Sequence, residues 1–283
     1  MKVVIVGAGG RLGRELVAQF PGCVALTRKD WDLEIPGVSK ILKEIRPDII
    51  INAAAKCGVE ACAAEPPQAF QINAAVPVEL AHFASRSGAA LYHISSDYVF
   101  DGTKGSPYVE TDGPSPVNFY GWSKLMGENA SLICPWMVTL RIGSLMGDDL
   151  NGIGDVLKQT GNPIQVLRQI CTPVTTTTAA RLIKQIVDMR AKSTWGNGVF
   201  HLGAKQSIWK RDAAICLLAA TGRETAVIDN VLPGRPIFAA LNCQRVHETF
   251  GLQLPNVADE LRIVTRFAGY ETTDTAFSRL TLQ

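Results

Sequence analysis

The chain opens with the stretch Val3-Val-Ile-Val-Gly-Ala-Gly-Gly-Arg-Leu-Gly13. The apolar run at its start predicts a buried strand, and the periodic pattern over Leu12–Phe20 predicts a helix directly after the turn. Glycines at Gly7, Gly10 and Gly13 permit a tight turn and a close approach to a pyrophosphate, which the helix N-terminus stabilises. The strand-turn-helix context favours a dinucleotide-binding turn, and a glycine turn without a ligand is the alternative.

Apolar runs alternate with helical patterns through the rest of the first half. The predicted strands are Val3–Val6, Val24–Leu26, Asp48–Asn52, Ala90–Ser95 and Met137–Ile142. The predicted helices are Leu12–Phe20, Val38–Glu44, Ala69–Ser87 with a bend at Pro77, and Gly121–Leu132. This alternation predicts an α/β fold with a Rossmann-type doubly wound parallel sheet.

The pattern loosens in the second half of the chain. Helical stretches at Asp155–Gln159, Ala179–Met189 and Trp209–Ala220 alternate there with loops rich in Pro, Gly and Thr. We expect residues 1–147 to form mainly the dinucleotide-binding Rossmann domain. Residues 148–283 should form mainly a smaller C-terminal substrate-binding lobe, with some elements returning to the sheet.

Composition narrows the class of protein. Lys and Arg number 28 against 26 Asp and Glu, so the formal charge is +2, and the charges are scattered. No basic stripe indicates nucleic acid and no cationic tract indicates a membrane surface. The apolar start is too short for a signal-peptide core, and no run has the length of a membrane span, so we expect a cytoplasmic protein.

The cysteines do not predict a metal site or a disulfide framework. They number seven, which is odd, and they are spread along the chain. Cys57 and Cys62 are close in sequence, but no second pair or nearby histidine completes a zinc site. We therefore expect no bound metal.

Tyr120 and Lys124 carry the strongest chemical signal. On a helix, residues four apart lie on the same face. A cation beside a phenol favours the phenolate and should pull its pKa from about 10 toward neutrality. Such a pair can pass a proton to a carbonyl oxygen while a nicotinamide cofactor supplies hydride. Downstream of a dinucleotide turn, the pair predicts a reductase.

Two further positions extend the predicted site. Ser96 follows a predicted strand and can donate a hydrogen bond to a substrate carbonyl, although serines at strand ends also form turns. Arg28 follows the second strand, where arginine suits a 2′-phosphate, so NADPH is favoured and NADH remains an alternative. Arg28 as an ordinary solvated charge is the other reading. Asp32 is placed to accept hydrogen bonds from the adenine or ribose.

With these residues in place, the chain resembles the dTDP-4-dehydrorhamnose reductase family within the extended short-chain dehydrogenase/reductase superfamily. The resemblance covers nearly the whole chain. Its markers are Arg46-Pro-Asp-Ile-Ile-Ile-Asn-Ala-Ala-Ala55, Ile72-Asn-Ala74, Ile94-Ser-Ser-Asp-Tyr-Val-Phe-Asp-Gly102, Pro107-Tyr108, Glu110, Asp112, Pro116-x-Asn118-x-Tyr120-Gly-x-Ser-Lys124, Gly127-Glu128, Gln169 to Pro173, Arg235-Pro236 and Thr249-Phe-Gly-Leu-Gln-Leu-Pro255.

The resemblance implies a role for each matching position. Tyr120 would be the proton donor, Lys124 would bind the nicotinamide ribose and tune Tyr120, and Ser96 would bind the keto oxygen. The cofactor site would comprise Gly7, Gly10, Arg11, Leu12, Gly13, Arg28, Asp32, Leu33, Ala53, Ala54, Ala55 and Lys56, together with Tyr120 and Lys124. The sugar pocket would comprise Ser96, Asp97, Tyr98, Cys57, Val59 and Ser144.

The chain departs from the family pattern in two places. Where relatives usually continue with an aromatic or His residue and Thr-Ala-Val-Asp, it has Lys56-Cys-Gly-Val-Glu60. Where they tend to have Arg-Thr-Ser-Trp, it has Arg141-Ile-Gly-Ser144. Replacing a large ring with a small residue removes an apolar contact and opens space in a pocket. We expect the chemistry to survive these changes better than the sugar specificity.

The default function implied by the resemblance is NADPH-dependent reduction of a nucleotide-activated 4-keto-6-deoxy sugar, with dTDP-4-dehydrorhamnose as substrate. One alternative is a different keto sugar or another secondary metabolite. Another is a non-catalytic NADP-binding regulatory subunit, because the regulatory subunit of methionine adenosyltransferase looks similar and keeps a Tyr-Lys pair. Relatives often form dimers, so a homodimer is also open.

Overall fold

The computed structural model describes residues 1–35, 37–190, 197–271 and 277. The chain forms two compact units. Unit 1 comprises Met1–Phe100, Gly113–Arg141 and Ala180–Phe200, and unit 2 comprises Asp101–Asp112, Ile142–Ala179 and His201–Gln283. The chain therefore passes between the units several times.

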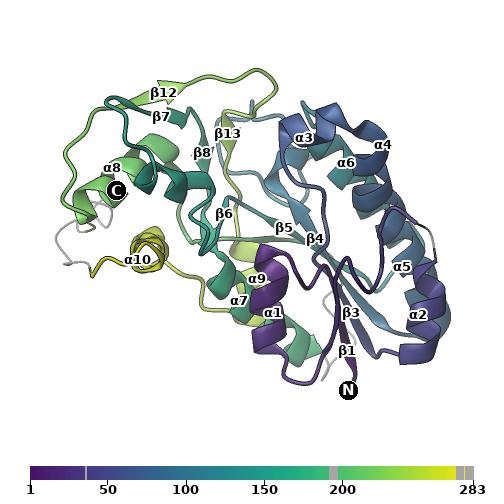
Figure 1. The fold of residues 1–283 in the computed structure, drawn as a ribbon. Coiled ribbons are helices and arrows are strands. Elements are labelled where there is room, and N and C mark those ends of the chain that lie inside the picture. The colour runs from purple at the N-terminus through teal and green to yellow at the C-terminus, as the bar shows by residue number, and fades with distance from the viewer. Residues whose placement is uncertain (36, 191–196, 272–276, 278–283) are drawn as a thin grey trace. The chain divides into compact units, whose positions relative to one another are not determined.

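A six-stranded sheet forms the centre of unit 1 (Figure 1), in the order β10-β5-β4-β3-β1-β2. Its strands are β1 (Val3–Val6), β2 (Val24–Leu26), β3 (Ile49–Asn52), β4 (Ala90–Ser96), β5 (Val138–Ile142) and β10 (Gly198–Leu202), the last of which ends in unit 2. β1 pairs in parallel with β2 and β3, and β3 pairs in parallel with β4. Every residue of β1 and β3 is buried, because helices cover both faces of a parallel sheet. The predicted parallel α/β sheet is confirmed.

The helices of unit 1 flank this sheet. They are α1 (Arg11–Gln19), α2 (Val38–Ile45), α3 (Val59–Ala64), α4 (Pro66–Phe70), α5 (Val76–Ser87), α6 (Phe119–Glu128) and most of α7 (Thr176–Arg190). Figure 1 shows α1 on one face of the sheet and α2 on the other, where α2 packs against α5. Short helical turns lie at η1 (Gln71–Ala75), η2 (Asp97–Val99) and η3 (Asn129–Leu132).

Three local predictions differ from the structure. The expected single helix over Ala69–Ser87 is α4, a π-helical turn and α5, so the irregularity precedes Pro77. Pro77 lies in the first turn of α5, directly after the π-helical turn. Instead of a helix over Asp155–Gln159, the structure has the 3₁₀ helix η4 (Gly152–Leu157). The short α3 was not predicted, because six residues give too little periodicity.

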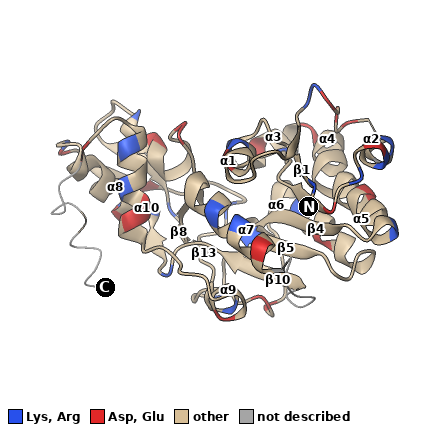
Figure 2. Ribbon diagram, turned by 90° about the horizontal axis from the view of Figure 1, so that it is seen from below, with Lys and Arg blue, Asp and Glu red and all other residues tan. Residues whose placement is uncertain are grey.

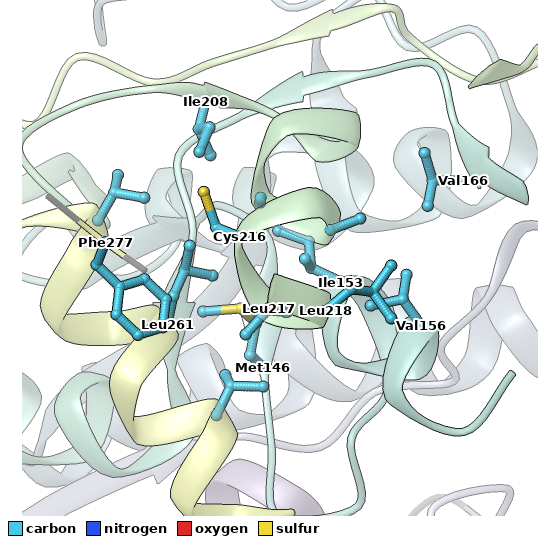
Figure 3. Close-up of a cluster of buried hydrophobic side chains, with 14 of the residues drawn as sticks. Met146, Ile153, Val156, Val166, Ile208, Cys216, Leu217, Leu218, Leu261 and Phe277 are labelled. Atoms are coloured by element: carbon cyan, nitrogen blue, oxygen red, sulfur yellow. The ribbon is translucent and has the colours of Figure 1, made fainter. Parts of the chain in front are cut away.

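Unit 2 is built from small sheets and helices around its own core. Its strands are β6 (Leu145–Met146), β7 (Ile164–Leu167), β8 (Ile170–Cys171), β9 (Val174–Thr175), β11 (Ile208–Trp209), β12 (Val227–Asn230) and β13 (Phe238–Ala239). Its helices are α8 (Lys210–Ala220), α9 (Gln244–Phe250) and α10 (Val257–Phe267). Figure 3 shows the core, in which Leu217 of α8 and Leu261 of α10 are fully buried with Met146 and Phe277.

Charge and hydropathy are unremarkable over the described part of the chain. Figure 2 shows basic and acidic positions interspersed on helices such as α2 and α7. Among the residues the structure describes, no helix is long and apolar enough to cross a membrane. Within the same residues, no group of His, Cys, Asp or Glu side chains is arranged to hold a metal ion.

Candidate active site

The glycine turn between β1 and α1 is shaped by close backbone approaches. Gly7 has a φ of +79°, and a Cβ atom there would lie 2.6 Å from the Ala54 backbone nitrogen. A Cβ atom on Gly13 would lie 2.1 Å from the Gly7 carbonyl oxygen. The Gly10 N–H donates to that same oxygen at 2.9 Å, and α1 begins directly afterwards. Only glycine fits Gly7 and Gly13, and the turn presents the amide groups of the first turn of α1.

The other predicted pyrophosphate residues follow from this turn. Arg11 is half-buried at the first position of α1, and Leu12 is buried against the sheet. Because Gly10 caps the helix and has no side chain, the first-turn N–H groups receive no side-chain acceptor from the capping residue. N–H groups at the positive end of a helix favour an anion.

The loop after β2 carries the residues predicted to select the cofactor. Arg28 is 78% exposed, and its Nη2 atom lies 4.0 Å from Glu34 Oε1. Asp32 is exposed, and its Oδ1 atom accepts the Glu34 N–H at 3.1 Å. Leu33 is half-buried and packs against the core beneath α2 and α5. The loop is ordered by Asp30, which accepts hydrogen bonds from the Thr27 N–H and hydroxyl at 2.8 and 2.6 Å.

Asn73 joins the segment after β3 to helix α6. The Lys56 N–H donates to Asn73 Oδ1 at 2.9 Å, and Asn73 Nδ2 donates to the Lys56 carbonyl at 2.9 Å and to Ser123 Oγ at 2.9 Å. Ser123 Oγ in turn donates to the Tyr120 carbonyl at 2.8 Å. Asn73 is fully buried. It therefore fixes the predicted cofactor-lining residues Ala53 to Lys56 relative to the helix that carries Tyr120 and Lys124.

Two glycines let α6 approach its neighbours closely. A Cβ atom on Gly121 would lie 1.9 Å from the Tyr98 carbonyl oxygen, and one on Gly127 would lie 2.2 Å from the Asn73 carbonyl oxygen. The close approach at Gly121 places the centroids of the Tyr120 and Tyr98 rings 5.9 Å apart. The rings meet edge to face, with an interplanar angle of 68°. The glycines of this helix thus place Tyr120 against the end of β4.

The end of β4 supplies the predicted hydroxyl and carboxylate. Ser96 Oγ donates to Asp97 Oδ1 at 2.9 Å and accepts the Tyr98 N–H at 3.2 Å. Ser96 also hydrogen-bonds to Tyr120. Ser96 and Asp97 are both buried, and Tyr98 is half-buried. Unit 1 therefore brings Ser96 and Tyr120 into direct contact.

The protonation of the Tyr/Lys pair differs from the expected one. Burial raises the pKa of Tyr120 well above its usual value, and the neighbouring Cys57, Asp97 and Cys62 add to this, against a smaller lowering by the Ser96 hydrogen bond. Burial also lowers the pKa of Lys124 to about 8. The Lys124 Nζ atom donates to the Ile94 carbonyl at 2.6 Å. The predicted shift of the pKa of Tyr120 toward neutrality is wrong, because burial is the largest cause of its shift and raises the pKa.

The remaining predicted substrate residues divide between the units. Cys57 is exposed and lies close enough to Tyr120 to influence its pKa, and Val59 is half-buried at the start of α3, which contacts α6. Ser144 belongs to unit 2, where it is half-buried and its carbonyl accepts the Val174 N–H at 3.1 Å. Every other predicted site residue lies in unit 1.

Sequence reasoning missed a buried ion pair behind the site. The guanidinium of Arg141 binds Glu128 through its Nε and Nη2 atoms, with Nη2 at 2.7 Å from Glu128 Oε2, and both side chains are at most 7% exposed. Ser95 Oγ donates to Glu128 Oε1 at 2.6 Å. Glu128 raises the pKa of Lys124 and so favours its charged form. The available signal was an arginine inside the apolar strand β5, whose charge had to be paired.

A parallel sheet, a dinucleotide-binding turn and a Ser96, Tyr120 and Lys124 set define the class of protein. It is an oxidoreductase of the extended short-chain dehydrogenase/reductase superfamily. The family model described as "RmlD substrate binding domain" matches residues 1–267. The chain belongs to this family, the dTDP-4-dehydrorhamnose reductase family.

Individual relatives and structures agree with this assignment. The chain is 30% identical to the dTDP-4-dehydrorhamnose reductase of Burkholderia thailandensis, over 90% of this chain and 95% of the relative. It is 31% identical to that of Sinorhizobium fredii, over 93% and 96% of the two chains. A crystal structure of a dTDP-4-dehydrorhamnose reductase from Clostridium acetobutylicum superimposes with a TM-score of 0.85 at 29% identity, covering 95% of this chain and 99% of that one.

Proposed function

We propose that the chain is an NADPH-dependent reductase of a nucleotide-activated 4-keto-6-deoxy sugar, with dTDP-4-dehydrorhamnose as the first candidate. The names of the relatives in Burkholderia thailandensis and Sinorhizobium fredii support the substrate class. The observation that carries the proposal is the contact between Ser96 and Tyr120 at the end of β4, with Lys124 one helical turn further along α6.

The residues of unit 1 fit a dinucleotide. Gly7 and Gly13 allow a turn that a Cβ atom would disrupt, whereas a Cβ atom on Gly9 would make only an ordinary van der Waals contact with Thr27 at 3.9 Å. The first-turn amides of α1 would hold the pyrophosphate. Arg28 is exposed beside this turn and would bind a 2′-phosphate, which favours NADPH over NADH.

In the reaction, a bound nicotinamide would supply hydride to the sugar C4 carbon. The Ser96 hydroxyl would donate a hydrogen bond to the keto oxygen and orient it. As that oxygen gains negative charge, the Tyr120 phenol would transfer its proton to it. Tyr120 is protonated at neutral pH, as a proton donor must be, but its raised pKa makes it a weaker acid, so the negative charge that develops on the keto oxygen has to drive the transfer.

Lys124 would act beside the phenol. Its Nζ atom is held by the Ile94 carbonyl at 2.6 Å, which fixes the ammonium at the level of β4. From there it would bind the nicotinamide ribose. With a pKa of about 8 the group is mostly charged at neutral pH, and Glu128 favours that charge.

A different keto sugar is a second candidate, favoured by the segment after β5. Gly143 cannot carry a side chain, since a Cβ atom would lie 2.2 Å from the Thr172 carbonyl oxygen. Ser144 follows it where relatives tend to carry a tryptophan. A serine in place of a tryptophan leaves more room beside it, so a larger or differently substituted sugar is the second candidate.

The test measures the oxidation of NADPH by its absorbance, with dTDP-4-keto-6-deoxyglucose as substrate, in the presence and absence of a 3,5-epimerase. Turnover only with the epimerase supports the rhamnose-type reaction. Turnover without it, or faster turnover of another keto sugar, supports the second candidate. NADPH binding without oxidation of any sugar in the panel would overturn the proposal and favour a non-catalytic role.

A further inference from the structure

Two thiols lie at the start of α3, in the segment where the chain departs from its family. Cys57 is exposed, and Cys62 is fully buried one helical turn further on. The mechanism proposed above uses neither thiol as a reacting group. Gly58 lies between them with a φ of +94°, and the Cys62 N–H donates to the Gly58 carbonyl at 3.0 Å. Helix α3 therefore starts in a sharp turn.

The backbone holds the two side chains close together. Cys62 Sγ lies 3.3 Å from the Lys56 carbonyl oxygen, and that carbonyl belongs to the peptide unit that leads into Cys57. A carbonyl oxygen lies about 2.8 Å from the next Cα in a trans peptide, so Cys62 Sγ is at most about 6 Å from Cys57 Cα. Cys57 Sγ itself lies 3.9 Å from the Ala55 carbonyl oxygen. A disulfide needs the two sulfurs about 2 Å apart, so its formation requires rotation of the exposed Cys57 side chain and a movement of the turn.

The same thiols face the proposed active site. Cys57 and Cys62 both influence the pKa values of Tyr120 and Lys124, and Cys57 is the largest influence after burial in each case. Burial raises the pKa of Cys62 to about 11, and the neighbouring Cys57 adds to this rise. The exposed Cys57 is thus the thiol that meets an oxidant first, and the buried Cys62 stays protonated beside it.

We propose that Cys57 and Cys62 form a dithiol modification site that peroxide converts to a disulfide, and that this disulfide inactivates the enzyme. Cys57 sulfur would attack one peroxide oxygen and break the O–O bond, which gives a sulfenic acid and one water. Cys62 sulfur would then attack the Cys57 sulfur and form the S–S bond, while the Cys62 thiol proton joins the departing Cys57 hydroxyl to give a second water. The two thiols are oxidised by two electrons and hydrogen peroxide is reduced to two waters.

Inactivation follows from the position of Cys57. The disulfide pulls the Cys57 side chain toward α3 and strains the turn after Lys56, whose N–H and carbonyl both bind Asn73. Asn73 connects this turn to Ser123 of α6. A displacement of about 1 Å at a reacting group can reduce turnover roughly a hundredfold. Reduction with dithiothreitol restores the thiols and the activity.

The test combines peptide mass with activity on the full-length chain. After hydrogen peroxide, iodoacetamide and then trypsin, the single peptide that contains both Cys57 and Cys62 should be unalkylated and two hydrogen atoms lighter than the reduced peptide. Turnover should fall roughly a hundredfold and recover with dithiothreitol. In Cys62→Ser the sulfenic acid has no resolving thiol, so excess peroxide should oxidise Cys57 further to the sulfinic acid, which carries two added oxygens and which dithiothreitol does not reduce. Cys23→Ser, at a half-buried thiol beside β2, should behave as wild type.

Two results would overturn the proposal: free alkylation of both cysteines after peroxide, or a disulfide that leaves turnover unchanged. The turnover measurement rests on the proposed function, but the peptide mass measurement does not. A disulfide in a chain that reduces no sugar would therefore refute the reductase assignment alone.

Discussion

Replacing Lys124 with methionine should stabilise the fold while it removes activity. Lys124 is 2% exposed, and burial lowers its pKa from 10.5 to about 8. At about 1.4 kcal/mol for each pH unit, this difference corresponds to about 3 kcal/mol of stability lost at neutral pH. Lys124→Met removes that cost but also loses the bond to the Ile94 carbonyl, worth about 1.5 kcal/mol. We expect the free energy of unfolding to rise by about 1–2 kcal/mol.

The pH dependence supplies the sign of the effect. Between pH 8 and 10.5 the unfolded chain holds a proton at Lys124 that the folded chain has released. The stability of the wild type therefore rises with pH across this window relative to Lys124→Met. The difference in free energy of unfolding that favours Lys124→Met over the wild type at neutral pH should shrink by about 3 kcal/mol and change sign.

Urea unfolding of both proteins at neutral pH and at about pH 10 measures this difference. Lys40→Met, at an exposed position of α2, is the matched control and should change stability by less than about 0.5 kcal/mol. If the difference between wild type and Lys124→Met is the same at both pH values, the reasoning about the buried ammonium is refuted.

Two further substitutions test the packing around the site. Glu128→Gln leaves the Arg141 guanidinium buried without its counter-charge, so urea unfolding should show a loss of about 3 kcal/mol in stability. Replacing Glu128 and Arg141 together with methionine should recover most of that loss. Equal losses in the single and double variants would contradict this. Gly13→Ala places a Cβ atom 2.1 Å from the Gly7 carbonyl oxygen and should cost about 1–3 kcal/mol, while Gly9→Ala, with 3.9 Å to its nearest neighbour, should fold normally by thermal unfolding. Equal stability of the two alanine variants would show that the turn is looser than described.

The sequence was sufficient for the parts of the fold that depend on local pattern. β1 and β3 are continuous buried apolar runs, and the parallel sheet follows from their alternation with helices. The pairing of Tyr120 with Lys124 follows from helical spacing alone. These features need no knowledge of distant residues.

Features that depend on distant partners could not be predicted. The π-helical turn at Gln71–Ala75 carries Asn73, whose partners lie 17 and 50 residues away. The ion pair of Glu128 and Arg141 joins a helix to a strand across the interior of unit 1. The direction of the Tyr120 pKa depends on burial, which the spacing of residues does not reveal.

The most direct test of the central claim is the turnover of the preferred keto sugar by Tyr120→Phe, compared with wild type in the presence of saturating NADPH. The variant lacks only the phenolic hydroxyl that would protonate the sugar oxygen. Loss of a general acid predicts a fall in turnover of roughly a hundredfold or more, with NADPH still bound. Full turnover by Tyr120→Phe would contradict the assignment of the active site.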